Sequence, residues 1–202
     1  MLEAISISKR HPAHGKEWLF REFSLYLASG EIVGLQGESG SGKSTLCRIL
    51  AGMEGAEHGD VLLNGESRLK QTRRKGYQPV QLVFQHPEKA VNPRWRVNSI
   101  LYEGWQPEPS LLEELHIEGS WLQRYPMELS GGQLQRICIA RALSPNTQFL
   151  LADEMTTMLD AITQAQIWRT MLSIVEERKL GMLVVSHDQH LLSRICHRVV
   201  SL

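Results

Sequence analysis

The chain has 202 residues, of which 42% are hydrophobic, so it can form one large domain or a domain with an insertion, and disorder is disfavoured. Its 22 basic and 22 acidic residues cancel, which argues against a nucleic-acid protein that works by bulk charge. Cys47, Cys138 and Cys196 form no C-x-x-C pair, so we expect a reduced, cytosolic compartment. No apolar run has the length of a membrane span, so a membrane role needs a partner.

The first fifty residues predict strands of two kinds. Residues 2–8 and 19–27 alternate apolar and polar side chains, which is typical of antiparallel strands with one exposed face, and a turn at 11–15 separates them. Residues 31–35 are instead an apolar run that suits a buried parallel strand. A helical pattern of apolar residues follows at 46–50.

A glycine-rich loop joins this strand to this helix. It reads Gly37-Glu38-Ser39-Gly40-Ser41-Gly42-Lys43-Ser44-Thr45 and fits the phosphate-binding pattern G-x-x-x-x-G-K-[ST]. Its glycines let successive backbone N–H groups point at phosphate oxygens, and the helix N-terminus adds partial positive charge there. Lys43 can then reach the β- and γ-phosphates, and the Ser44 hydroxyl can ligate Mg²⁺. The alternative is a glycine-rich turn before an ordinary helix, which leaves the Lys-Ser pair to coincidence.

Further strands and helices alternate along the rest of the chain. Short apolar runs at 80–84, 148–152, 182–185 and 198–200 predict strands. Strands that alternate with helices around a phosphate loop indicate an α/β fold of the phosphate-loop NTPase type. We expect a central, mainly parallel sheet covered on both sides, with an N-terminal antiparallel β part and an inserted α-helical part.

The inserted part is recognised by a change of composition. Residues 86–126 are rich in Pro, Trp, Glu and Leu, with short helical patterns at 97–104 and 109–124. Three of its tryptophans favour core positions over a protein contact, namely Trp95, Trp105 and Trp121. After the insertion, one face of a helix is marked by Ile162, Ala165, Trp168, Met171, Leu172 and Val175.

Two acidic residues, Asp153 and Glu154, directly follow the predicted strand at 148–152. The carboxyl ends of parallel strands line the ligand crevice of an α/β sheet. An Asp there can hold Mg²⁺, directly or through water, and the Glu can orient and deprotonate an attacking water. An acidic pair after a strand is by itself commonly a helix-start feature, but together with Lys43-Ser44 it favours catalysis.

A second motif, Leu129-Ser130-Gly131-Gly132-Gln133, begins a predicted helix. Ser130 and Gln133 form a capping box, so an ordinary helix start is the alternative. Two glycines in a first helical turn weaken a helix, and they make sense if another surface approaches the backbone closely. The free N–H groups and Ser130 would then face an anion, which suggests a phosphate presented by another molecule.

These motifs together resemble a known family. They are Gly37–Thr45, Gln85, Leu129–Gln133, Asp153-Glu154, Asp160 and Ser186-His187. In this combination they resemble the nucleotide-binding subunit of ATP-binding-cassette (ABC) transporters over nearly the whole chain. The resemblance implies hydrolysis of ATP with Mg²⁺ in a head-to-tail dimer with a second ABC ATPase subunit. Each ATP would lie between the phosphate loop of one subunit and the Ser130–Gln133 turn of the other.

The family's roles carry over to individual residues. Gln85 would lie in the loop that senses Mg²⁺ and contacts the transporter, and Asp153 would serve the metal. Glu154 would polarise the water, and His187 would steady the γ-phosphate, although a lone His after a strand is usually structural. Asp160 would touch the opposite subunit.

Three positions depart from the family pattern. The family stacks an aromatic residue on adenine, and His11 is the matching candidate here, with Trp18 further on. Met155 stands where Pro is usual, and Met158 where a small residue is usual. Both flank the predicted catalytic residues, so we expect hydrolysis with an unusual geometry or rate.

Stretches 83–87, 91–94 and 125–128 are similar to the peptide/nickel importer branch of the family. That similarity implies transmembrane permease subunits as partners, a solute-binding protein indirectly, no nucleic acid, and a place at the cytoplasmic face of the cell membrane. The rival interpretations are a soluble ABC ATPase that acts in DNA repair or on the ribosome, a non-hydrolysing regulatory module, and a small-molecule kinase.

The resemblance also implies how the chain is divided. Residues 1–202 would be a single ABC ATPase domain. Within it, 1–84 and 147–202 would form the core, and about 86–146 would form the helical subdomain that carries the Ser130–Gln133 motif.

Overall fold

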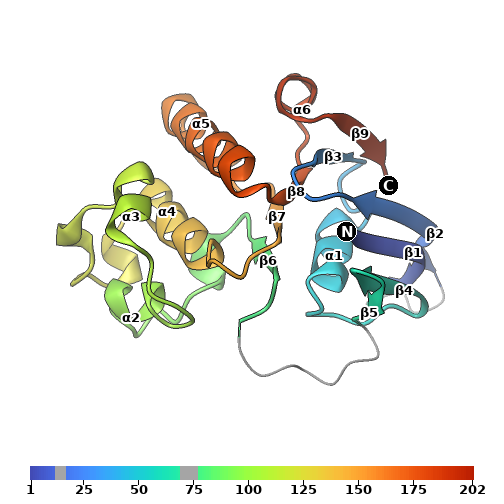
Figure 1. The fold of residues 1–202 in the computed structure, drawn as a ribbon, viewed down its shortest axis with the longest axis horizontal. Coiled ribbons are helices and arrows are strands. Elements are labelled where there is room, and N and C mark those ends of the chain that lie inside the picture. The colour runs from blue at the N-terminus through green and yellow to red at the C-terminus, as the bar shows by residue number, and fades with distance from the viewer. Residues whose placement is uncertain (12–16, 69–76) are drawn as a thin grey trace.

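The computed structural model describes residues 1–11, 17–68 and 77–202, which form two β-sheets and a set of helices (Figure 1). Most of the turn predicted at 11–15 lies outside these residues. The α/β fold class predicted above is confirmed, with an antiparallel sheet beside a parallel one.

The antiparallel sheet contains the N-terminal strands in the order β2-β1-β4-β5. Its strands are β1 (Leu2–Arg10), β2 (Trp18–Leu27), β4 (His58–Leu63) and β5 (Glu66–Ser67). β1 pairs antiparallel with β2 on one side and with β4 on the other. The antiparallel strands predicted at 2–8 and 19–27 are therefore confirmed.

The second sheet is parallel throughout and has the order β6-β7-β8-β3-β9. Its strands are β3 (Ile32–Gln36), β6 (Val80–Val83), β7 (Phe149–Asp153), β8 (Gly181–Val185) and β9 (Arg198–Ser201). β7 and β8 are buried along their whole length, as expected for central parallel strands. Because all strands run the same way, their carboxyl ends meet at one edge of the sheet.

The parallel sheet separates two hydrophobic cores. Along β8, Met182 and Val184 belong to the core shared with the helical side, whereas Leu183 and Val185 belong to the core shared with the antiparallel sheet. The second core also contains the apolar side of α1 (Lys43–Leu50). This alternation follows from the two-residue period of a strand, and it explains why the run at 182–185 contains no polar residue.

Three α-helices and three short 3₁₀ helices lie between β6 and β7 in sequence and beside the sheet in space (Figure 1). They are the 3₁₀ helices Pro87–Lys89, Gly119–Trp121 and Pro126–Glu128, and α2 (Val97–Leu101), α3 (Pro109–Glu114) and α4 (Gly131–Ala142). The core position predicted for Trp121 is confirmed, and Trp105 packs against the same core and donates to the Arg141 carbonyl at 2.9 Å. The prediction is wrong for Trp95, which is 42% exposed.

Two helices follow β7 and β8: α5 (Ala161–Arg178) and α6 (Gln189–Ile195). The predicted face of α5 is correct at Trp168, Met171 and Val175, but wrong at Ile162 and Ala165, which are exposed. The apolar stripe keeps helical spacing along the entire helix, whereas burial begins only at Ile167, where α5 packs into the core beside the sheet.

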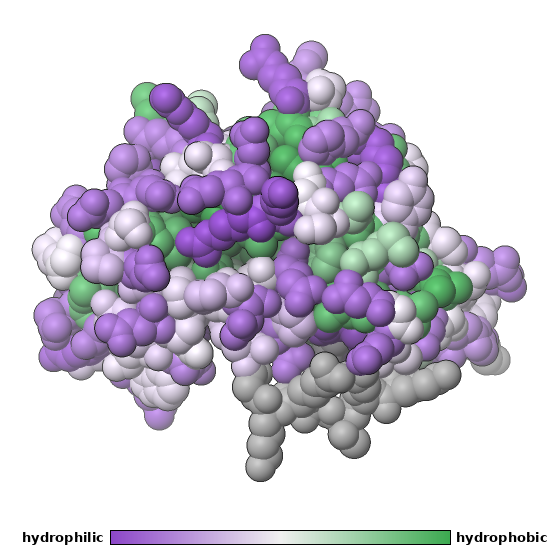
Figure 2. All heavy atoms as spheres, viewed as in Figure 1, coloured by the Kyte–Doolittle hydropathy of each residue, from purple (hydrophilic) through white to green (hydrophobic). Residues whose placement is uncertain are grey.

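The surface seen in Figure 2 is mainly hydrophilic, with apolar side chains gathered in separate patches. In the part of the chain that the structure describes, no helix combines the length and the apolar character needed to cross a bilayer.

Candidate functional site

The phosphate loop connects the carboxyl end of β3 to the first turn of α1. Gly40 and Gly42 have positive φ angles of 82° and 101°, which a residue with a β-carbon rarely adopts. The loop curls around Lys43, whose Nζ donates to the carbonyl oxygens of Gly37 at 3.0 Å and Glu38 at 2.8 Å. The loop thus holds a cationic side chain against a row of backbone groups.

One atom of this loop indicates what it binds. The Ser41 Oγ is buried and has no hydrogen-bond partner among the described residues. A buried hydroxyl without a partner is costly, and a phosphate oxygen would satisfy it. The backbone N–H groups, the Lys43 ammonium and this hydroxyl together fit an anionic phosphate.

The predicted metal ligands lie together. Ser44 Oγ, in the first turn of α1, donates to Asp153 Oδ1 at the end of β7 over 3.1 Å. Burial raises the pKa of Asp153, and the neighbouring Glu154 carboxylate raises it further, while Ser44, Arg48 and Lys43 act in the opposite direction. A buried carboxylate whose charge is disfavoured is stabilised by a cation, so this hydroxyl–carboxylate pair fits Mg²⁺.

The pair does not form a complete cage for a metal. No group of three or more His, Cys, Asp or Glu side chains suited to a metal ion is found in residues 1–11, 17–68 and 77–202. Mg²⁺ is typically held in proteins by one or two protein ligands together with phosphate oxygens and water. The arrangement therefore suits a magnesium ion that arrives with a nucleotide.

Three strand ends bring the predicted catalytic groups into contact. Gln85 Nε2, just past β6, donates to Glu154 Oε2 at 3.0 Å. His187 Nε2, just past β8, lies 3.0 Å from the other oxygen, Oε1. Both carboxylate oxygens of Glu154 are therefore engaged, while its backbone N–H donates to the Val185 carbonyl at 3.1 Å. The Glu154 carboxylate is fixed at the edge of the sheet next to Asp153.

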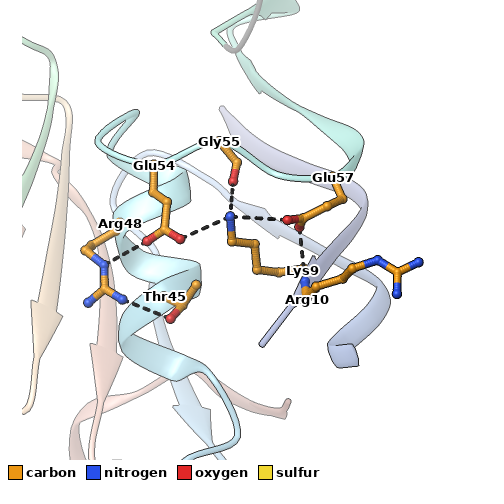
Figure 3. A network of polar contacts seen from close by, with 7 residues as sticks. All are labelled: Lys9, Arg10, Thr45, Arg48, Glu54, Gly55 and Glu57. Atoms are coloured by element: carbon orange, nitrogen blue, oxygen red, sulfur yellow. Dashed lines mark hydrogen bonds and ion pairs between the residues drawn. The ribbon is translucent and has the colours of Figure 1, made fainter. Parts of the chain in front are cut away.

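A polar network that the sequence did not suggest braces the helix behind the phosphate loop (Figure 3). Arg48 Nη2 donates to Thr45 Oγ1 at 2.9 Å, and Arg48 Nε lies 3.0 Å from Glu54 Oε2. Lys9 Nζ on β1 lies 3.1 Å from Glu54 Oε1 and 3.6 Å from Glu57 Oε1. Such pairs contribute little singly, but linked together they tie α1 to β1. Lys9 is far from Glu54 and Glu57 in sequence, and only the cluster of Arg48, Glu54 and Glu57 could have hinted at the network.

The second motif forms the N-terminus of α4. Ser130 Oγ accepts from the Gln133 N–H at 3.2 Å, and Gln133 Oε1 accepts from the Ser130 N–H at 2.9 Å. This is the capping box that the sequence predicts. A β-carbon added at Gly132 would lie 3.0 Å from Thr163 Cγ2, whereas one at Gly131 would meet only Leu159 Cδ2, at 3.8 Å, among the described residues. Packing within the chain therefore accounts for a small residue at 132 but not at 131.

Asp160 caps the neighbouring helix α5. Its Oδ1 accepts from the backbone N–H groups of Ile162 at 3.1 Å and Thr163 at 3.0 Å, and its Oδ2 accepts from the Thr163 hydroxyl at 2.6 Å. The bond from the Thr163 hydroxyl, followed by these backbone bonds, lowers the pKa of Asp160. Asp160 is therefore a helix cap in this chain, whatever it contacts outside it.

The predicted site residues thus fall into two groups. The first contains the phosphate loop, Asp153, Glu154, Gln85 and His187, and the second contains Ser130–Gln133 and Asp160. No hydrogen bond or ion pair between described residues joins the two groups. His11 directly follows β1 and is half-buried, and its N–H donates to the Glu17 carbonyl at 2.9 Å.

Comparison with known proteins agrees with this geometry. Residues 20–157 match the family described as "ABC transporter". The chain is 37% identical to the nickel import ATP-binding protein NikE of Shigella boydii and to that of Escherichia coli, over 97% of this chain and 81% of each relative.

Solved structures of ATP-binding cassettes have a similar fold. The fold is similar to the dimeric ATP-binding cassette MJ0796 in a post-hydrolysis state bound to ADP and phosphate, with a TM-score of 0.85 and 26% identity. Another dimeric structure of that cassette gives a TM-score of 0.82 and 25% identity. Each alignment covers 100% of this chain and 94% of the other.

Proposed function

This chain belongs to the ABC transporter family as an ATP-binding and ATP-hydrolysing subunit, and from that premise we propose that it energises the import of nickel or a related metal chelate. The observation that carries the catalytic part is the contact of Glu154 with both Gln85 and His187, beside the Ser44–Asp153 pair. The nickel part is supported by the relatives, which are named nickel import ATP-binding proteins.

We assign the first group of residues to one ATP. The phosphate loop would bind the β- and γ-phosphates through its N–H groups, Lys43 and Ser41. Ser44 and Asp153 would hold Mg²⁺, which supplies charge neutralisation between the phosphates when bound. Gln85, which bonds Glu154 beside this pair, would sense the presence of the metal.

Glu154 would act as the base. Each Glu154 oxygen has one contact in the structure and can accept a second, so the carboxylate can take the proton of the attacking water, while the half-exposed imidazole of His187 would turn to the γ-phosphate. The Gln85 bond would keep the carboxylate aligned while it accepts the proton. Catalysis by this group would be mainly positioning and charge stabilisation.

The second group of residues would complete the ATP site of another subunit. The turn at Ser130–Gln133 presents backbone N–H groups and a helix dipole, and Gly131 leaves its backbone open to a close approach. Asp160 and its loop stand next to this turn through Leu159 and Thr163. The dimer that we propose is head-to-tail and consists of two identical or two related cassettes.

The helical part between β6 and β7 would face the membrane subunits. We propose the division given by the sequence, with about 86–146 as the helical subdomain and 1–84 and 147–202 as the core. Trp95 follows Gln85 and the 3₁₀ helix Pro87–Lys89 in the same segment and is 42% exposed, so it suits a contact with a permease at the cytoplasmic face of the membrane. A solute-binding protein would act only through that permease.

The test is uptake of ⁶³Ni²⁺ in source cells that lack the coding sequence. We expect nickel accumulation to fall, to be restored by the wild-type chain, and not to be restored by Lys43→Ala. A loss of oligopeptide uptake with normal nickel uptake would replace nickel by peptides as the cargo. Normal uptake of both, with ATPase activity of the purified chain stimulated by nucleic acid, would contradict the transport proposal.

A further inference from the structure

Glu154 has a backbone conformation that must be held in place. Its φ angle is 49°, in the left-handed region that residues with a β-carbon rarely adopt. The next residues form a tight loop, in which Thr157 N–H donates to the Glu154 carbonyl at 3.1 Å and Leu159 N–H donates to the Thr156 carbonyl at 3.0 Å. Backbone strain of this kind persists only where the surroundings fix it.

A buried side-chain bond anchors this loop. Trp168 Nε1, in the second turn of α5, donates to Thr156 Oγ1 at 3.1 Å, and the two residues are only 6% and 4% exposed. Met155, between Glu154 and Thr156, is 2% exposed and packs in the same core as Trp168. A second side-chain bond to α5, from Gln164 Nε2 to the Leu159 carbonyl at 2.9 Å, lies at the far end of the loop. The Trp168–Thr156 bond is the buried contact nearer to Glu154, and it lies within an apolar setting.

The chemistry of this pair makes the contact specific. An indole has a single donor, and burial leaves it no water to bond instead, so losing the Thr156 hydroxyl would leave the Trp168 N–H unsatisfied. The loop would then shift to find another partner for it. Glu154 is two residues away in a strained conformation, and a relaxed loop would turn its carboxylate from the position that Gln85 and His187 define.

We propose that Thr156 and Trp168 are positioning residues for ATP hydrolysis, which hold Glu154 in its left-handed conformation through their buried hydrogen bond. The inference rests on the proposed role of Glu154 as the base. It predicts an effect on the chemical step rather than on nucleotide binding, since the phosphate loop lies on other elements. A displacement of a catalytic group by about 1 Å can reduce a rate by about a hundredfold.

The test compares four single variants of the full chain, together with the double variant at Thr156 and Trp168 and a parallel Glu154→Gln variant. Thr156→Val keeps the shape and removes the hydroxyl, Thr156→Ser keeps the hydroxyl, and Trp168→Phe keeps an aromatic ring and removes the donor. Met171→Leu is the matched control, since Met171 is fully buried on the same face of α5 but is not a partner in the Trp168–Thr156 hydrogen bond. ATPase kcat and KM, ATP affinity and the unfolding temperature are measured for each.

We expect Thr156→Val and Trp168→Phe each to lower kcat about tenfold with ATP affinity within about twofold of wild type. The double variant should be no slower than either single one, because both remove the same bond. Thr156→Ser should retain at least half of the wild-type kcat. Met171→Leu should shift the unfolding temperature with kcat unchanged.

Three results would overturn the inference: a wild-type kcat in Thr156→Val, an equal loss in Thr156→Ser, or a loss in Met171→Leu that tracks its unfolding temperature. Glu154→Gln is assayed in parallel to separate this inference from the role of Glu154. If Glu154→Gln hydrolyses ATP normally, the base assignment fails. If it is inactive while Thr156→Val is normal, only the positioning role fails.

Discussion

Replacing Gly131 by alanine should affect stability and ATP hydrolysis in opposite directions. A β-carbon there would meet Leu159 Cδ2 at 3.8 Å, which is an ordinary contact, so the folded chain can accept alanine. Alanine is favoured over glycine within a helix by about 0.5–1 kcal/mol, and we take the lower value in a first turn. Gly131→Ala should therefore raise the unfolding temperature by about 1–2 °C in a chain of this size.

The same variant should lose hydrolysis. In the proposed dimer this turn lies against a γ-phosphate held by the partner, and an added methyl would hold the N–H groups away from it. Removing one such donor from a transition state lowers kcat by about 10²–10³. We expect at least a tenfold loss of ATPase activity, measured as phosphate release over a range of protein concentrations.

The neighbouring position is the matched control. A β-carbon at Gly132 would lie 3.0 Å from Thr163 Cγ2, so Gly132→Ala should lower the unfolding temperature as well as the activity. A Gly131→Ala chain that is stable and hydrolyses ATP at the wild-type rate would refute the idea that a second molecule approaches this turn.

Two further predictions concern the nucleotide and metal groups. Lys43→Ala should weaken ATP binding at least about tenfold, because its ammonium is the cation inside the phosphate loop; unchanged affinity in equilibrium dialysis would count against the loop as the ATP site. Burial raises the pKa of Asp153, so its charge disfavours folding above that pKa, and the cost disappears as the pH falls through and below it. Asp153→Asn should thus raise the unfolding temperature at pH 7 without Mg²⁺, with a smaller gain near pH 4; a decrease at pH 7 would disprove this sign.

The strand ends were predictable because chemistry and periodicity agree there. Apolar runs mark β7 and β8, and polar residues follow each run at once, so Asp153, Glu154 and His187 could be placed at one edge from the sequence. The capping box of α4 was equally local, since Ser130 and Gln133 are three residues apart.

Contacts between distant segments could not be predicted in the same way. Thr156 bonds Trp168 across a helix start, and Lys9 meets Glu54 across 45 positions, and neither pair leaves a periodic trace in the sequence. The exposed first turns of α5 were missed for a related reason. Ile162 keeps the helical spacing of a core residue, but only the packing decides where the core begins.

Because the side chains of β8 alternate between two hydrophobic cores, this strand cannot tolerate a change of register. A slip of one residue would send Met182 and Val184 into the space shaped for Leu183 and Val185, and would carry His187 out of reach of Glu154. An insertion or deletion in β8 would therefore damage folding and turnover in one event. For this strand, selection for a well-packed interior and selection for a working enzyme are the same pressure.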